Sequence, residues 1–321
     1  MMRISFVRST MGAVASLILG LAFANDVQAH EVRFVASYGS NTNLCTRDAP
    51  CATLQRGINR TPAGGELIIL DSGDYGNNGT INKSITISAV GVTATLGGGM
   101  TIDATDATVV LRGLRLNGEG VGGNGIDIVT GATVHVHIDH CEIDGYDVGI
   151  NVNTEAYPTL SVANSVVRNN GTYGLYFRTG TPGQLIVDHS RFEHNDGNGI
   201  RIEGGGASIT RTVAAGNGLI GFIVSFGAKA NISWTTAEHN GFDGYSSSGH
   251  MTLEQSVARG NARYGLVVSQ SPGTAVVSGS AFTNNGTGIF QEFGTILSRG
   301  NNTVSGNTTD VSGSLTPLGG T

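Results

Sequence analysis

A repeat of about 23 residues runs through most of this 321-residue chain and constrains its fold more than any other feature. The repeat shows first in glycines that precede short apolar segments, at spacings of 21 to 25 positions: Gly125, Gly149, Gly174, Gly199, Gly221, Gly244, Gly265 and Gly288. An asparagine column has the same period: Asn170, Asn195, Asn217, Asn240, Asn261, Asn285 and Asn307. So does a column of small residues: Cys141, Ser165, Ser190, Thr212, Ser256 and Ser280. Three columns in phase indicate stacked structural repeats.

The residues that follow each glycine alternate between apolar and polar, which is typical of a strand with one buried face. The first inward column is Ile126, Ile150, Leu175, Ile200, Phe222, Tyr245, Leu266 and Ile289. The second is Ile128, Val152, Phe177, Ile202, Val224, Ser247, Val268 and Gln291. At roughly 1.5 to 3 kcal/mol per large side chain, burial of the first column contributes about 12 to 24 kcal/mol before ordering entropy is subtracted. Only coils stacked at about 4.8 Å bury these columns continuously, so the sequence predicts an all-β fold, a parallel β-helix solenoid.

The asparagine and small-residue columns fit the corners of such a coil. Asparagine tolerates the left-handed backbone of a tight corner, and its amide can bond to the copy in the next coil. We therefore expect a structural ladder. The small-residue column is interpreted as a stack inside the coil, which makes Cys141 a buried packing residue rather than a reactive thiol.

Composition excludes several classes of protein. Glycine supplies 50 residues, only 13% of residues are charged and 39% are apolar. This combination disfavours helices and coiled coils, and the apolar share is too high for a disordered chain. Without residues 1–29 the net charge is about −7, which should repel nucleic acid. Lys83 and Lys229 are the only lysines, so a polybasic membrane-binding patch is not expected either.

The N-terminus predicts export. Residues 1–29 combine Arg3 and Arg8, an apolar run over 11–24, and the small-residue end Val27-Gln28-Ala29. This pattern is typical of a cleaved signal peptide, and no later stretch is apolar and long enough to predict insertion into a membrane. We expect a secreted protein, either extracellular or periplasmic. Because such compartments are oxidising, Cys45 and Cys51 are predicted to form a local disulfide.

Several segments resemble the N-terminal part of right-handed β-helix proteins of the pectate-lyase-like superfamily. They are Pro50-Cys51-Ala-Thr-Leu-Gln-Arg-Gly-Ile58, Thr61-Pro-Ala-Gly-Gly-Glu-Leu-Ile-Ile-Leu70 and Asp74-Tyr75-Gly76. The resemblance covers about residues 33–311 and implies a short N-terminal capping helix with Leu54 and Ile58 on its buried face. The chain is also similar to small secreted bacterial β-helix proteins without an assigned activity. The resemblance to the pectate-lyase-like superfamily implies a fold but no particular reaction, because the superfamily includes lyases, hydrolases, epimerases, adhesins and copper-site accessory proteins.

The chain is thus divided into a signal peptide (1–29), an N-terminal cap with the disulfide (30–60), the β-helix (61–311) and a C-terminal tail (312–321). Two motifs resemble metal sites within this frame. His135-Val-His137-Ile-Asp139-His140 matches a metal-binding HxHxDH string, but its alternation places His135, His137 and Asp139 outward on one strand. Residues 122–129 match one calcium-binding nonapeptide, whose usual period of nine is absent here. After cleavage His30 would be the N-terminal residue and could chelate copper, although a plain terminus is the simpler interpretation. We predict no metal site and no cofactor.

The outward strand positions of the middle coils concentrate polar and aromatic groups over a strip roughly 15 Å long. Its predicted substrate-binding residues are Asp127, Asn151, Asn153, Tyr176, Arg178, Arg201 and Glu203. An aromatic face suits a sugar ring, amides suit hydroxyls, and arginine forks suit uronate carboxylates. The competing interpretation is an ordinary solvated sheet face on which Arg201 pairs with Glu203 or lies beside Arg178.

Three function classes remain at the level of sequence. The first is an exported protein that binds a polysaccharide or cell-surface glycan along this strip. The second is a polysaccharide lyase or glycoside hydrolase. Asp127 and Glu203 lie about 14 Å apart, too far for the 5 to 9.5 Å of paired glycosidase carboxyls, and the histidines at 189, 194 and 239 fall at predicted corners. The third is a structural or adhesin solenoid. The glycan and the oligomeric state stay open.

Overall fold

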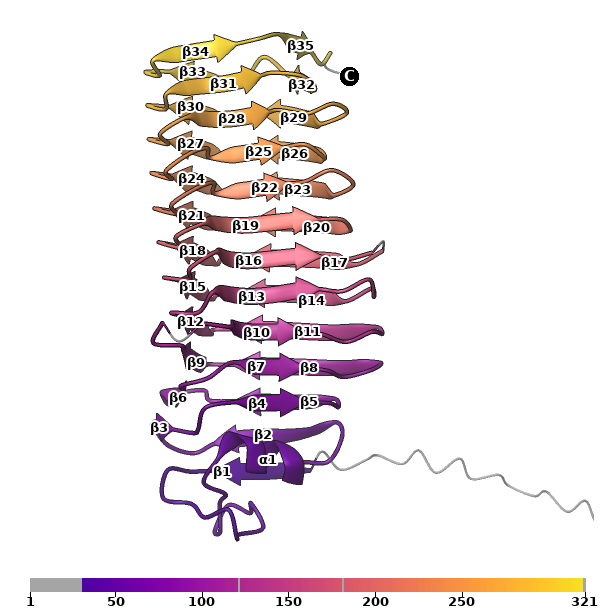
Figure 1. Ribbon diagram of the computed structural model, residues 1–321, viewed down its shortest axis with the longest axis vertical. Helices are drawn as coiled ribbons and strands as arrows, with labels where there is room; N and C mark the ends of the chain where they lie inside the picture. Colours follow the sequence, from indigo (N-terminus) through magenta and orange to yellow (C-terminus); the bar gives the residue numbers. More distant parts are fainter. Residues whose placement is uncertain (1–30, 121, 181, 320–321) are drawn as a thin grey trace, which may run out of the picture.

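The structure, a computed structural model, describes residues 31–319 apart from residues 121 and 181. Figure 1 shows one straight stack of coils, with the N-terminal strands at one end and the last strands at the other. The predicted signal peptide and His30 lie outside the described residues. No helix within the described residues has the length and apolarity needed to span a bilayer.

Three parallel sheets run along the stack. Each complete coil adds one strand to each sheet, and sheet A alone extends by one further strand at each of the two ends. Sheet A has 13 strands: β1 (Val32–Val35), β2 (Gly65–Ile69), β5 (Ile85–Ser88), β8 (Ala107–Arg112), β11 (Val134–Asp139), β14 (Thr159–Ala163), β17 (Gln184–Asp188), β20 (Gly206–Thr210), β23 (Lys229–Ser233), β26 (His250–Glu254), β29 (Thr274–Ser278), β32 (Thr295–Ser298) and β35 (Leu315–Pro317).

Sheet B has 11 short strands: β3 (Gly73–Asp74), β6 (Ala94–Leu96), β9 (Leu114–Asn117), β12 (Glu142–Asp144), β15 (Val166–Arg168), β18 (Arg191–Glu193), β21 (Val213–Ala215), β24 (Thr236–Glu238), β27 (Val257–Arg259), β30 (Ala281–Thr283) and β33 (Thr303–Ser305).

Sheet C also has 11 strands: β4 (Gly79–Ile81), β7 (Met100–Ile102), β10 (Asn124–Ile128), β13 (Val148–Asn153), β16 (Tyr173–Arg178), β19 (Asn198–Glu203), β22 (Phe222–Val224), β25 (Tyr245–Ser247), β28 (Tyr264–Val268), β31 (Thr287–Gln291) and β34 (Thr309–Ser312). The predicted all-β parallel solenoid is therefore confirmed.

The predicted inward columns form the core between the sheets. Every residue of the first column is buried, and its members pair in register from coil to coil, as Ile150 does with Ile126 and Leu175. The second column is buried as well, except that Gln291 is half-buried near the C-terminal end. Phe222 and Tyr245 stack with ring centroids 5.1 Å apart inside the coil. The period-two pattern thus predicted which side chains face the core.

The N-terminal end contains the only helix of the described residues, α1 (Leu54–Arg60). Thr53 is its N-cap and accepts a hydrogen bond from the Arg56 backbone N–H. Leu54 and Ile58 are buried, as the resemblance implied, and the helix contacts β1 and β4. Cys45 and Cys51 form the predicted disulfide in the loop that precedes it.

The asparagine column forms the predicted ladder at the corner between sheets B and C. Each side-chain amide donates to the carbonyl oxygen of the next asparagine at 2.9 to 3.1 Å, from Asn170 to Asn307. We expected the left-handed backbone conformation at the asparagines themselves, but the structure has it one position earlier. The left-handed residues precede the asparagines, as Asn169 (φ 53°), His194 (φ 52°) and His239 (φ 52°) do. The preceding residue makes the bend, which turns the asparagine side chain inward onto the ladder.

The corner between sheets A and B likewise places a left-handed residue before a buried one. From β11 to β30 it always contains two residues, first one in the left-handed region and then a small buried one. The backbone N–H of Cys141 donates to Ser165 Oγ at 3.1 Å, and Ser165 N–H donates to Ser190 Oγ at 3.2 Å. Thr235 fills this column where the sequence pattern showed a gap. Cys141 is buried as predicted, and burial raises the pKa of its thiol to about 11.

Candidate functional site

The predicted strip lies on the exposed face of sheet C, on four adjacent strands. Asp127 of β10 pairs with Asn151 of β13, Asn151 with Tyr176 of β16, and Tyr176 with Arg201 of β19. In the neighbouring column Asn153 pairs with Arg178, and Arg178 with Glu203. All seven predicted residues therefore occupy one continuous surface, because their period matches the coil.

Two tyrosines of β16 form the aromatic part of this surface. The rings of Tyr173 and Tyr176 stack at 5.1 Å with 20° between their planes. The guanidinium carbon of Arg201 lies 5.9 Å from the centre of the Tyr173 ring, within the range of a cation–π interaction. We name Tyr173, Tyr176, Arg201 and Glu203 the first platform.

Glu203 holds the polar edge of the first platform. It accepts a hydrogen bond from the Tyr176 hydroxyl at 2.7 Å and one from Arg201 Nε at 2.5 Å. Partial burial opposes ionisation, but the bonds from Tyr176 and Arg201 outweigh it and lower the pKa of Glu203. Burial and the same carboxylate raise the pKa of Tyr176 to about 12. At neutral pH the platform thus presents a carboxylate, a guanidinium and a neutral phenol.

Arg178 connects this platform to a groove beside it. Its guanidinium donates to Asn153 Oδ1 at 3.1 Å and to Glu155 at 3.4 Å. The groove has a volume of about 490 Å³ and lies where sheet C turns into sheet A. Its lining includes Arg178, Arg201, Glu203, Thr179 and Phe226. The buried Thr179 hydroxyl has no hydrogen-bond partner among the described residues.

Two further hollows continue this groove along the same corner. One of about 470 Å³ shares Phe226 and Ser248 with it, and one of about 450 Å³ shares Glu155. Two aromatic rings stand exposed on these walls, Phe226 with 70% and Tyr157 with 50% of its surface accessible. The corner between sheets C and A is therefore a channelled edge next to the first platform.

The structure divides the predicted residues into two groups. Tyr176, Arg178, Arg201 and Glu203 are brought together, with Asn153 bonded to Arg178. Asn151 instead donates to Asp127 at 2.7 Å, so these two form a separate polar pair at the N-terminal side. The ion pair between Arg201 and Glu203, which the competing interpretation predicts, is also present.

Sequence reasoning missed Tyr173, Glu155 and the groove residues. Tyr173 precedes the glycine of its repeat and so falls outside the alternating positions that were compared. A search for aromatic residues just before the repeat glycines would have found it, and would also have found Tyr264. Glu155 and Phe226 belong to corners of variable length, where the period gives no register.

The histidine motif lies elsewhere, on β11 of sheet A. His135 and His137 are exposed on the outward face as expected, while His140 occupies the next corner and its Nδ1 lies 2.8 Å from Asp139 Oδ1. Partial burial of Asp139 is outweighed by hydrogen bonds from Asn164 and His140, which lower its pKa. Within the described residues no three His, Cys, Asp or Glu side chains converge as metal ligands.

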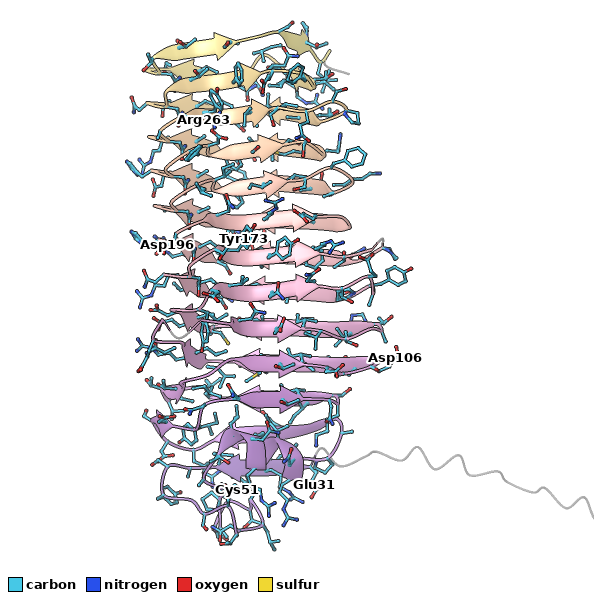
Figure 2. The ribbon with its side chains drawn as sticks, viewed as in Figure 1. Glu31, Cys51, Asp106, Tyr173, Asp196 and Arg263 are labelled. Atoms are coloured by element: carbon cyan, nitrogen blue, oxygen red, sulfur yellow. A yellow bond between two sulfur atoms is a disulfide. The ribbon has the colours of Figure 1, made fainter. Side chains whose placement is uncertain are left out.

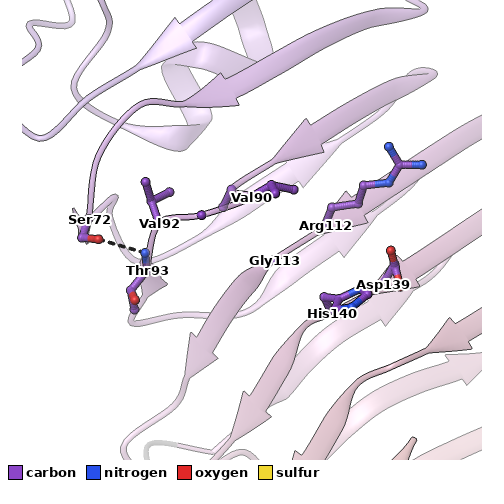
Figure 3. A pocket seen from close by; sticks show the side chains of 10 residues that line it. Ser72, Val90, Val92, Thr93, Arg112, Gly113, Asp139 and His140 are labelled. Carbon is purple, nitrogen blue, oxygen red and sulfur yellow. Dashed lines mark hydrogen bonds and ion pairs between the residues drawn. The ribbon is translucent and has the colours of Figure 1, made fainter. Parts of the chain in front are cut away.

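A hollow of about 610 Å³ lies at the corner between sheets A and B, shown from close by in Figure 3. It forms where the connection from β5 to β6 spans five residues and leaves Val90 with 75% of its surface accessible. Arg112, Asp139 and His140 line it as well. On its wall the Thr93 N–H donates to Ser72 Oγ at 2.9 Å. None of its lining residues belongs to a strand of sheet C.

Comparisons with known proteins agree with the fold. A family model described as a right-handed β-helix region matches residues 148–309, about half of the chain. A rhamnogalacturonan lyase structure is similar with a TM-score of 0.61 and 14% identity, covering 82% of each chain. The A-module of an Azotobacter vinelandii mannuronan C-5 epimerase is similar with a TM-score of 0.56 and 15% identity, covering 79% of this chain and 91% of that one. A pectate lyase, Pel9A, is similar with a TM-score of 0.53 and 15% identity, covering 88% of this chain and 78% of that one. No curated protein matches the sequence significantly.

Proposed function

This chain belongs to the right-handed β-helix family, and we propose that it is an exported protein that binds a polysaccharide or surface glycan along the exposed face of sheet C. The binding surface is the first platform with Arg178, Asn153 and the adjoining groove. The polar pair of Asp127 and Asn151 extends it toward the N-terminal coils.

The observation that carries this proposal is the stacked pair Tyr173 and Tyr176 with Arg201 beside it. Sugar rings present C–H groups that pack on aromatic faces, while their hydroxyls and carboxylates need directed donors and acceptors. Glu203 accepts hydrogen bonds and Arg178 donates them within one coil of the tyrosines. The first platform therefore offers both kinds of contact on adjacent strands.

Two further observations support a polymeric ligand. The three similar structures are named for action on rhamnogalacturonan, pectate and mannuronan, all of which are polysaccharides. The surface is also open and elongated, because the groove and its two neighbouring hollows follow the stack rather than closing around a small molecule. A long chain can lie along such an edge with many weak contacts.

The test is retention of the mature protein on immobilised polygalacturonate, alginate and xylan, with and without calcium. We expect saturable retention on at least one polymer, reduced about ten-fold in Arg201→Gln and in Tyr176→Ala, because each removes one main contact. Arg211→Gln is the matched control, because this substitution removes the same charge from an exposed arginine at the corner between sheets A and B. Retention that falls equally in Arg211→Gln would indicate non-specific ion exchange, and absence of retention on all polymers would refute the proposal.

The same incubation separates binding from catalysis. Product is monitored as unsaturated-sugar absorbance and as new reducing ends. Binding without product is the outcome that the proposal expects. Product that forms in the wild type and disappears in Glu203→Gln would instead make this surface an active site of a lyase or hydrolase.

A further inference from the structure

A second cluster of aromatic rings lies on sheet C toward the C-terminus, and its strand β28 is four coils beyond β16, the strand of Tyr173. Tyr264 of β28 and Phe290 of β31 stack with ring centroids 4.6 Å apart and 24° between their planes. Tyr264 precedes the repeat glycine Gly265, as Tyr173 precedes Gly174. Four coils correspond to about 19 Å along the stack. Figure 2 labels Tyr173 and Arg263 on the same side of the molecule, separated along its long axis.

Arg263 completes this second cluster. Its guanidinium carbon lies 4.6 Å from the centre of the Tyr264 ring and 5.3 Å from that of Phe242. The ion pair with Asp243 is loose, at 3.9 Å from Nε to Oδ1, and the Arg263 side chain is 49% accessible. Arg201, in contrast, is held closely by Glu203 and is 34% accessible. The second guanidinium therefore keeps more of its hydrogen-bonding capacity for a ligand.

The surface between the two clusters is continuous. Leu219, Phe242 and Arg263 follow one another in successive coils, since Phe242 N–H donates to Leu219 O and Arg263 N–H donates to Phe242 O, both at 2.8 Å. Leu219 and Phe242 are each 39% accessible. Ile223 and Ser246 occupy the neighbouring outward column and pair across β22 and β25. An apolar row, with Ile223 and Ser246 beside it, thus lies between the two clusters.

We propose that Tyr264, Phe290, Arg263 and Phe242 form a second sugar-binding platform, so that one polysaccharide chain lies along the long axis of sheet C and contacts both platforms. This inference rests on the proposed function and extends it to the length and direction of the ligand. The chemistry of the site, two stacked rings with an accessible guanidinium, suits a sugar ring that carries a carboxylate or hydroxyl toward Arg263.

The experiment compares the intact polymer with its trisaccharide fragments, using whichever of polygalacturonate, alginate and xylan the wild type binds. A trisaccharide is shorter than the roughly 19 Å between Tyr173 and Tyr264 and cannot pack on both stacked ring pairs. The polymer can contact both ring pairs and gains from effective concentration. We expect Tyr264→Ala and Arg263→Gln each to weaken polymer binding about ten-fold, and to leave one trisaccharide site with unchanged affinity at the first platform. Trp234→Ala is the control, because Trp234 is an exposed aromatic residue at the corner between sheets A and B, away from sheet C.

The outcomes distinguish the two proposals. Polymer affinity that is unchanged in both variants while Tyr176→Ala weakens it would overturn the second platform and leave the first intact. Equal weakening in Trp234→Ala would overturn it as well, because the effect would then be general. A wild type that binds none of the three polymers would overturn both proposals. Arg263→Gln shortens the side chain and removes the charge beside Asp243, so its thermal unfolding is measured together with that of the wild type. Equal unfolding of the two excludes a folding defect as the cause.

Discussion

The corner between sheets A and B and the corner between sheets C and A are built in opposite ways. From β11 to β30 the first always has two residues, a left-handed one and a small buried one. The second has between two and five residues from β10 to β32. The channelled edge with its three hollows lies on the variable corner. Where the first corner lengthens to five residues, between β5 and β6, a hollow appears there too.

This difference shows how the solenoid separates stability from recognition. The asparagine ladder satisfies buried groups in the same manner in each coil from Asn170 to Asn307, and the uniform corner repeats one backbone bend from β11 to β30. Removal of a ladder amide therefore disturbs several neighbours. The variable corner and the outward face of sheet C contribute little to the core and are free to differ between coils. We therefore expect substitutions at ladder positions to affect stability and substitutions at the platforms to affect binding.

The largest effect is expected from breaking the ladder. Asn217 donates to Asn240 at 3.0 Å and to the Phe192 carbonyl at 3.1 Å, and accepts from Asn195 at 2.9 Å. Asn217→Ala leaves these buried groups without partners and should lower the free energy of unfolding by about 3 kcal/mol. Urea denaturation measures it, with Asn231→Ala on the exposed face of β23 as the control. Equal losses in the two variants would contradict the role of the ladder.

A buried carboxyl at the ladder corner should give a pH-dependent effect of similar size. Burial raises the pKa of Asp243 to about 6 although Arg263 opposes this. Because the folded-state pKa lies above the unfolded value of 3.8, the stabilising contribution is present below pH 3.8 and is lost as pH rises through 6. Asp243→Asn should therefore raise the free energy of unfolding above pH 7 by about 2 to 3 kcal/mol, and should give no such gain near pH 4. Urea denaturation at the two pH values measures it. A gain that is independent of pH would contradict this account.

A smaller effect is expected from the left-handed position of the uniform corner. Trp234 has φ 57° and a 59% accessible side chain, so its backbone rather than its packing matters. Trp234→Val places a β-branched residue in this conformation and should cost about 1 to 2 kcal/mol relative to Trp234→Gly. Thermal unfolding of the pair measures the difference. A valine variant as stable as the glycine variant would show that the corner is not constrained.

The smallest effect is expected at Cys141. Serine occupies the same column in neighbouring coils, so Cys141→Ser should change the free energy of unfolding by less than about 1 kcal/mol. Because burial raises the thiol pKa to about 11, the native protein should not react with a thiol reagent at pH 8, whereas the urea-unfolded protein should. Fast labelling of the native state would place the thiol at the surface.

Periodic features of the molecule could be predicted from the sequence, and features of single coils could not. The inward columns and the pairing of Tyr176 with Arg201 follow from a constant period, because stacking repeats the same position in every coil. The left-handed bend was placed one residue too late, since glycine, asparagine and histidine share that position and hide its pattern.

The candidate site shows the same limit. Tyr176, Arg178, Arg201 and Glu203 were identified in advance, whereas Tyr173 precedes the alternating positions that were compared. Glu155 and Phe226 belong to loops whose lengths differ, and loop conformation depends on local contacts rather than on period. Tyr264 and Phe290 stack between adjacent coils but occupy different positions of the repeat, before and after the glycine. No single column of the repeat therefore revealed the second platform.

Hydrogen–deuterium exchange with and without bound polysaccharide tests the central claim most directly. The account predicts slower exchange with ligand in β16, in β19 and in the loops that follow them toward sheet A, and no change in the uniform corner between sheets A and B. Slowing that is equal at both corners, or slowing confined to sheet A while the polymer remains bound, would contradict a binding surface on sheet C.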